Sequence, residues 1–189
     1  PLFTLKGSNM FDLSVSAVKQ HADLFGDRLY KLKADKKELV MRYAACHQQF
    51  AAIKDWIISY KNLPFGAFEV ADSYRLEQSG ELLLCFRLRK LHMPDLHIFC
   101  RNMEEAIEAS LKVHRKINEE MKKIGRSYVY LINTTKSFLR ENKEFFLKIL
   151  EEGGKPALIK FYPEGKYYWV INVEYNIIDE IGRPREIGT

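Results

Sequence analysis

The chain has 189 residues, of which 47% are hydrophobic and 29% are charged, with a formal net charge of +5. This composition supports a folded core and excludes an intrinsically disordered chain. No apolar run approaches the roughly 18 to 20 residues of a membrane-spanning helix, so we expect no membrane partner. The 3 cysteines lack the spacing of a disulfide framework, which favours a reducing compartment and predicts a cytoplasmic protein.

Residues 1–34 are predicted to form an N-terminal arm with a short helix near residues 14–25. A first long helix is predicted to begin at Asp35, with Glu38 at capping-box spacing, and to end before Pro64. Its apolar residues recur at alternating steps of four and three, which is the spacing of a coiled-coil seam. This stripe consists of Leu39, Tyr43, Cys46, Phe50, Ile53, Ile57 and Tyr60.

Two runs of alternating polarity around Gln78-Ser79-Gly80 predict an antiparallel β-hairpin with one buried face. The first run covers residues 68–76, the second covers residues 82–89, and a third short strand is predicted at 96–99. A second long helix is then predicted over residues 102–125, with an apolar stripe of the same spacing. This stripe consists of Met103, Ile107, Ser110, His114, Ile117, Met121 and Ile124.

The last third of the chain predicts a third helix followed by a second hairpin. One of the two threonines at 134–135 is expected to cap the helix, and the glycine pair at 153–154 is expected to end it. Residues 157–161 are predicted to pair with residues 167–175 around a type I turn. Residues 179–189, which contain glycine, proline and charge, are predicted to fray.

These elements predict an α+β chain in which two long heptad-striped helices pair antiparallel as a coiled coil, with two antiparallel β-hairpins and a third helix. The expected organisation has four segments. They are the arm and short helix at 1–34, a helix–hairpin–helix unit at 35–125, a helix and β-hairpin unit packed on it at 126–178, and a flexible tail at 179–189. If the stripes face another chain instead, the protein is an oligomer, and the same residues are buried.

A group of thiols and imidazoles raises the question of a metal site. Cys85, His92, His97 and Cys100 lie within one short stretch, and Zn²⁺ prefers sulfur and nitrogen ligands. Their spacing is C-x6-H-x4-H-x2-C, which lacks the CxxC pair typical of structural zinc sites. We therefore expect no metal and no other cofactor. The alternative is a metal-dependent enzyme with a site near His92, Asp95 and His97.

Cationic residues gather on the polar face of the first hairpin and along the second long helix, where phosphates can bind them. The candidates for nucleic-acid binding are Arg75, Arg87, Arg89, Lys112, Arg115, Lys116, Lys122, Lys123 and Arg126. Tyr168 is added as an exposed ring that can stack on a base. Tyr167 and Trp169 fall on an apolar face, so we expect them in the core.

The sequence contains no phosphate-binding loop, nucleophile elbow, zinc-protease motif or dinucleotide fingerprint, and it identifies no catalytic residue. The leading hypothesis is a non-enzymatic basic binding or assembly protein that acts on nucleic acid or a nucleoprotein complex. The second hypothesis is a structural or adaptor protein that binds another polypeptide, or a second copy of itself, through its helical seam. Binding to nucleic acid that weakens steeply with salt would separate the first from the second.

Overall fold

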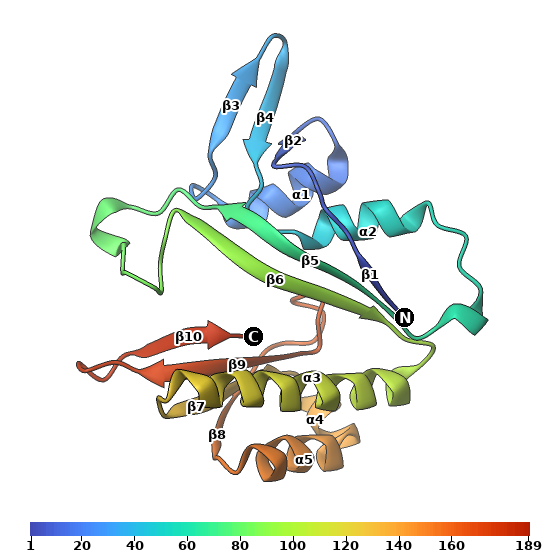
Figure 1. Ribbon diagram of the computed structural model, residues 1–189, viewed down its shortest axis with the longest axis vertical. Coiled ribbons are helices and arrows are strands. Elements are labelled where there is room, and N and C mark those ends of the chain that lie inside the picture. Colours follow the sequence, from blue (N-terminus) through green and yellow to red (C-terminus); the bar gives the residue numbers. More distant parts are fainter. The chain divides into compact units, whose positions relative to one another are not determined.

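Figure 1 shows the computed structural model, which describes residues 1–189 and combines α-helices with mostly antiparallel sheets. The α+β class is confirmed at this level. Contacts divide the chain into two units, Pro1–Met103 and Glu104–Thr189. This division falls one helix before the expected boundary at residue 125, and the four-segment organisation stays a prediction. None of the helices combines the length and the apolar character that crossing a membrane requires.

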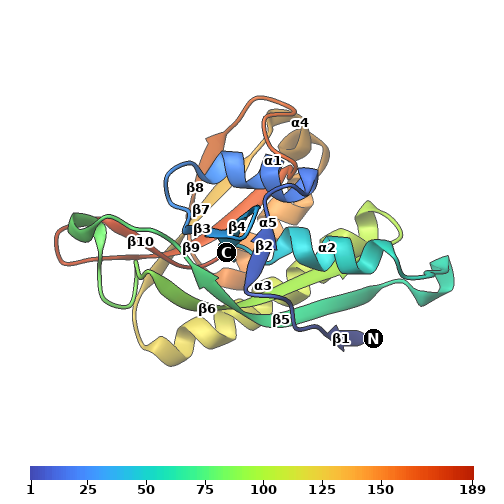
Figure 2. The same cartoon turned by 90° about the horizontal axis from the view of Figure 1, so that it is seen from above.

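The larger sheet of the first unit is built on a pair of long antiparallel strands, β5 (Phe65–Tyr74) and β6 (Lys90–Phe99). Strand β1 (Leu2–Thr4) lies parallel to β5 at the edge of this sheet (Figure 2). Helix α2 (Cys46–Lys54) packs through Ile53 on one face of the sheet. Burial alternates strictly along β6, so its odd-numbered residues face the helix side and its even-numbered residues face away.

A second sheet of the first unit carries its own small core. Helix α1 (Ser16–Phe25) buries Val18 and Ala22 in a cluster with Val40 and Tyr43, which are both 0% exposed. The strands run in the spatial order β2, β4, β3 and are all antiparallel. Their bounds are Met10–Asp12 for β2, Lys31–Ala34 for β3 and Lys37–Met41 for β4.

The predicted first long helix is wrong, and with it the antiparallel coiled coil. Residues 35–60 form β4, α2 and the start of a 3₁₀ turn at Tyr60–Asn62 rather than one helix. Asp35, the expected helix cap, has φ 55° and lies in the tight turn between β3 and β4. The stripe does not form a buried seam, because Phe50 is 42% exposed and Ile57 is fully exposed.

The predicted first hairpin is half right. Its first strand corresponds to β5, but the strand that returns beside it is β6 and not residues 82–89. Residues 75–89 form an excursion that contains a 3₁₀ turn at Ser79–Glu81 and an isolated bridge between Leu83 and Arg87. The predicted strand at 96–99 is the end of β6.

The second unit is a four-stranded sheet with helices packed on it, in the spatial order β10, β9, β7, β8. Strands β7 and β8 are parallel and are joined by a helical crossover, as parallel pairing requires. The strands are β7 (Tyr128–Thr134), β8 (Ala157–Phe161), β9 (Ile171–Ile178) and β10 (Pro184–Gly188). The helices are α3 (Met103–Ile124), α4 (Lys136–Glu141) and α5 (Lys143–Gly153).

The predicted second long helix is confirmed as α3, but only the middle of its stripe packs on the sheet of its own unit, because Met103 and Ile124 are each 52% exposed. His114 on this stripe is 4% exposed and contacts the Tyr175 hydroxyl through Nδ1 at 2.6 Å. Asn118, one turn later, accepts hydrogen bonds from the hydroxyls of Tyr128 and Tyr130, both at 2.8 Å. A buried polar network therefore lies beside Ile107, Ile117 and Met121, the stripe residues that pack on the core.

Three further predictions for this unit are corrected by the structure. The third helix is two helices that meet at Asn142, although Thr135 caps the first and Gly154 ends the second in a left-handed conformation as expected. Strands β8 and β9 do not pair with each other, because β7 lies between them. The predicted flexible tail forms β10 along β9.

Candidate functional site

The helix-facing side of the β5–β6 sheet carries charged and polar residues where an apolar face would be usual. In the strand register Ala67 lies opposite His97 and Glu69 lies opposite Asp95, so both pairs share this face. Gln49 of α2 reaches His97, with Oε1 at 2.8 Å from Nδ1. This contact joins the first turn of α2 to β6.

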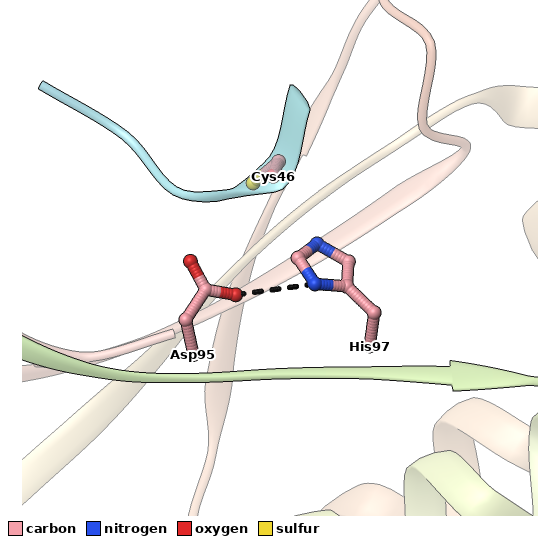
Figure 3. A group of neighbouring side chains, drawn as sticks. All are labelled: Cys46, Asp95 and His97. Atoms are coloured by element: carbon pink, nitrogen blue, oxygen red, sulfur yellow. Dashed lines mark ion pairs between the residues drawn. The ribbon is translucent and has the colours of Figure 1, made fainter. Parts of the chain in front are cut away.

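Cys46, Asp95 and His97 face one another across this space (Figure 3). One potential ligand atom of each residue lies within 4.8 Å of those of the other two. Nδ1 of His97 also lies 3.3 Å from Oδ1 of Asp95, and the side chains of this pair are only 19% and 17% exposed. The thiol comes from the first residue of α2 and the other two groups come from β6.

Burial sets the protonation of this group. It lowers the pKa of His97 and raises the pKa of Asp95, while the attraction between the two residues opposes both shifts. The neutral imidazole is therefore favoured near pH 7, and a metal ion needs that form because the ligating nitrogen must present a lone pair.

A buried ion pair lies beside the group. Nη2 of Arg42 is 2.7 Å from Oε2 of Glu69, and the two side chains are 1% and 5% exposed. Glu69 also accepts a hydrogen bond from the backbone N–H of Gly7 at 2.8 Å. Arg42 lowers the pKa of Asp95 and Glu69 raises it, so the two charges act on that carboxyl in opposite directions. Because it combines one positive and one negative charge, the pair adds no net charge beside the group.

The chemistry of these donors fits a borderline-soft divalent cation. Zn²⁺ takes thiolate, imidazole and carboxylate ligands in tetrahedral sites, and catalytic zinc keeps three protein ligands and one open position. Cys46, His97 and Asp95 supply three ligands of these types. Gln49 contacts Nδ1 of His97, so a metal held through Nε2 would leave that contact in place.

The four sequence-derived metal candidates do not come together. His97 is the one that joins the group described above. His92 lies on the opposite face of β6 and pairs with Asp72 at 2.9 Å. Cys85 is exposed in the excursion at φ 69°, and Cys100 follows the end of β6. Cys46 was missed because it lies far upstream of His97 and no local spacing links the two residues.

Two of the three candidate arginines of the first unit, Arg87 and Arg89, contact Glu77, which is 3% exposed. Arg87 Nε lies 2.8 Å from Glu77 Oε2, and Arg89 Nε donates to the Glu77 carbonyl at 3.0 Å. Arg75 follows β5 directly, and its guanidinium lies 5.4 Å from the centre of the Phe25 ring. The three cations are thus held at one end of the β5–β6 pair.

The candidate cations of the second unit lie on α3 or just after it, where acidic side chains accompany them. Arg115 binds Glu152 through two contacts of 2.8 and 3.2 Å. Lys116 and Lys123 both reach Glu120, at 2.9 and 2.7 Å. Lys112 and Lys122 are also on α3, and Arg126 follows it. The nucleic-acid role of this set, and of Tyr168 at 78% exposure, stays a prediction.

Comparison with known proteins identifies enzymes as relatives. Residues 30–189 match the family model described as the tRNA synthetase class II core domain (G, H, P, S and T). The whole chain is 64% identical to a threonine–tRNA ligase of Thermofilum pendens and 57% identical to one of Hyperthermus butylicus. It spans 31% and 30% of the length of these two relatives.

Solved structures support the same fold. The RNA binding domain of threonyl-tRNA synthetase from Cryptosporidium parvum superposes with a TM-score of 0.77 at 18% identity, over 98% of this chain and 47% of that chain. Prolyl-tRNA synthetase of Giardia lamblia in complex with prolyl-adenylate superposes with a TM-score of 0.52 at 17% identity, over 61% of this chain and 24% of that chain.

These findings correct two predictions. The prediction of a non-enzymatic assembly protein is wrong, because the relatives are ligases. The broader prediction of nucleic-acid binding agrees with the RNA in the names of these relatives. The coiled coil and the adaptor seam built on it have no counterpart in this fold. The match covers most of the chain and includes the strand that carries Asp95 and His97. The chain belongs to the tRNA synthetase class II core domain family (G, H, P, S and T).

Proposed function

We propose that this chain is part of a threonine–tRNA ligase and that its first unit supplies the amino-acid site of that enzyme. The observation that carries the proposal is the 64% identity to a threonine–tRNA ligase over all 189 residues. The polar face of the β5–β6 sheet supports it, because the buried Arg42–Glu69 pair lies there beside the grouped side chains of Cys46, Asp95 and His97.

Threonine has an amine and a hydroxyl on adjacent carbons, and both are donors that a metal can bind. We propose that Cys46, His97 and Asp95 hold a zinc ion whose remaining coordination favours such a pair. Valine has nearly the same shape but lacks the hydroxyl. A purely apolar pocket separates such isosteres poorly, whereas a site built around a hydroxyl rejects the analogue that lacks it.

The arginines around Glu77 suit the anionic part of the reaction. Joining a carboxylate to an RNA hydroxyl requires an activated acyl group, and the Giardia enzyme was solved with an acyl-adenylate. We propose that Arg75, Arg87 and Arg89 bind the phosphates of the corresponding threonyl intermediate or of the tRNA end. Glu77 would act by orienting the guanidinium groups, as the 2.8 Å contact with Arg87 supports.

Two measurements test the proposal. In the first, this chain replaces the matched segment of the Thermofilum pendens enzyme, and the chimera is assayed for charging of tRNA with threonine. We expect charging with threonine and not with valine. The proposal would be contradicted by a chimera that folds and has the oligomeric mass of the parent enzyme but charges no tRNA, or that prefers valine.

The second measurement is the metal content of the chain after dialysis against trace zinc. We expect about one zinc per chain, lost in Cys46→Ser and in His97→Ala. His92→Ala is the matched control, because His92 lies on the same strand but on the opposite face. Equal metal content in all four proteins would remove the zinc site from the proposal while leaving the ligase assignment to the charging assay.

A further inference from the structure

The segment between β8 and β9 holds a group of aromatic rings that the zinc site does not involve. We call Phe161, Tyr162, Tyr167, Tyr168 and Trp169 the aromatic surface. Tyr167 and Trp169 stack with their ring centres 4.6 Å apart and their planes at 9°. The Tyr162 ring meets both edge-on, at 5.1 and 5.9 Å. Tyr162, Tyr167 and Trp169 thus form one ring cluster, and Phe161 and Tyr168 are their neighbours in the sequence.

This cluster is not part of the core of the second unit. None of its rings belongs to the buried cluster that α3, α4 and α5 form with the sheet. Tyr168 is 78% exposed, Phe161 46% and Tyr167 41%. The expectation that Tyr167 lies in the core is therefore wrong. Large aromatic side chains normally lose most of their exposed area on folding, so several exposed rings in one place indicate a binding surface.

Lysines surround the rings. Lys160 and Lys166 lie 5.1 and 5.3 Å from the centre of the Tyr162 ring, and Lys136 lies 5.9 Å from the centre of the Phe161 ring. The acidic residue of the turn, Glu164, is occupied by Ser137, whose hydroxyl donates to it at 2.8 Å. The surface therefore combines aromatic rings with positive charge.

The segment is anchored at both ends before any ligand arrives. At its start, the Tyr162 N–H donates to the Thr134 carbonyl at 3.0 Å. At its end, the Thr134 hydroxyl donates to the Val170 carbonyl at 2.9 Å. Through Glu164, the segment also contacts Ser137 at the beginning of α4. An anchored surface loses little conformational entropy on binding.

We infer that the aromatic surface binds an unpaired RNA segment by stacking bases on its rings while the lysines contact the phosphates. The inference rests on the proposed function, which supplies RNA as the partner, and it assigns the contact to a place in the second unit. Rings in a cationic setting are the common feature of single-strand binders, since every base has a stacking face. Paired bases are already stacked, so a duplex gains only the charge contacts.

The experiment uses tryptophan fluorescence, because the chain has 2 tryptophans and only Trp169 lies in this surface. In a Trp56→Phe background, a single-stranded RNA of twelve nucleotides is titrated into the chain and quenching of Trp169 is followed. We expect saturable quenching by the single strand and much weaker quenching by a duplex of the same length. Absence of quenching by the single strand would overturn the inference.

Affinity is then compared among variants by filter binding with the same RNA and with intact tRNA. Tyr168→Ala is expected to weaken binding of the single strand by about fivefold or more, the effect of losing one stacked base. Lys160→Ala with Lys166→Ala should lower the salt slope by about 0.7 per lysine. Leu158→Ala is the control, because Leu158 is 70% exposed on β8 but lies outside the cluster.

The outcomes separate this inference from the proposed function. If the chain binds tRNA and Tyr168→Ala binds the single strand as tightly as Leu158→Ala does, the aromatic surface is not the contact and the ligase assignment is unaffected. If the chimera described above charges no tRNA but the single strand still quenches Trp169, the proposed function fails and the stacking surface stands. Far-ultraviolet circular dichroism checks that each variant is folded, which the exposure of Tyr168 leads us to expect.

Discussion

Removing the charge of Glu69 should be among the most destabilising single changes in the first unit. Glu69→Gln keeps the size of the side chain and an oxygen for the Gly7 N–H, but it leaves the Arg42 guanidinium without its counter-charge. Both partners are at most 5% exposed, so water cannot compensate. Breaking a buried ion pair in this way costs about 3–5 kcal/mol. A domain has only about 5–15 kcal/mol of stability, so the loss should be visible at once.

The assay is urea denaturation in a Trp169→Phe background, so that Trp56 reports on the first unit alone. Glu81→Gln is the matched control, because Glu81 pairs with Arg87 at the surface and the loss should stay below about 1 kcal/mol. Adding Arg42→Met to Glu69→Gln should recover most of the loss, since no buried charge is then left unpaired. A Glu69→Gln variant within 1 kcal/mol of the parent, with an unchanged denaturant slope, would refute this reasoning.

Three further predictions concern packing and pH. Gly153→Ala should lower the stability by about 1–3 kcal/mol in a thermal unfolding scan, because a Cβ there would overlap the Tyr130 hydroxyl and lie 2.7 Å from its ring carbons. Gly80→Ala is the control and should be neutral in the same scan, because its Cβ meets nothing within 4 Å. Asn118→Leu should cost about 2–4 kcal/mol by leaving two buried tyrosine hydroxyls without an acceptor, and calorimetry of the second unit would contradict this if the melting temperature did not fall. Burial lowers the pKa of His47 from 6.5 to about 4, so between these pH values the folded state binds fewer protons than the unfolded state. The free energy of unfolding should therefore be highest above pH 6.5 and decrease toward pH 4. His47→Phe should flatten that part of the pH profile.

Local signals predicted the second unit better than the first. Helix α3 follows from its own residues, with Glu104 and Glu105 in the first turn and Lys122 and Lys123 in the last, which complement the helix dipole. The end of α5 likewise follows from Gly154, which adopts the left-handed conformation that glycine tolerates. These features depend on neighbours within one or two turns, so one sequence is sufficient to predict them.

The first stripe failed because its spacing is compatible with more than one structure. Tyr43 and Ile53 are buried, as a seam would require, but they contact different clusters. Leu39 belongs to β4, whose pairing with β2 and β3 draws residues 37–41 out of any helix. Pairing with two neighbouring strands can override helix propensity, and a pattern read over seven residues does not contain the sequences of those strands.

Predicting the site requires the register of β6 as well as the residue types. Asp95 and His97 were recognised from their residue types, but their partner was sought among neighbours in sequence, at Cys85 and Cys100. The true return strand begins at Lys90, and this shift of pairing decides which residues share the inner face with Glu69. Once β6 is placed, its odd-numbered residues point toward α2, whose first residue is a cysteine.

The grouping of Cys46, Asp95 and His97 is therefore a consequence of register and not of spacing. The same argument explains why the aromatic surface was only partly foreseen. The alternation over residues 167–175 predicts one buried face for a strand, but the strand begins at Ile171, so the rings before it are released from the sheet. When an alternating sequence pattern begins several residues before the strand itself, the residues in between are apolar but are not buried by the sheet. An exposed apolar patch of this kind is a candidate binding surface.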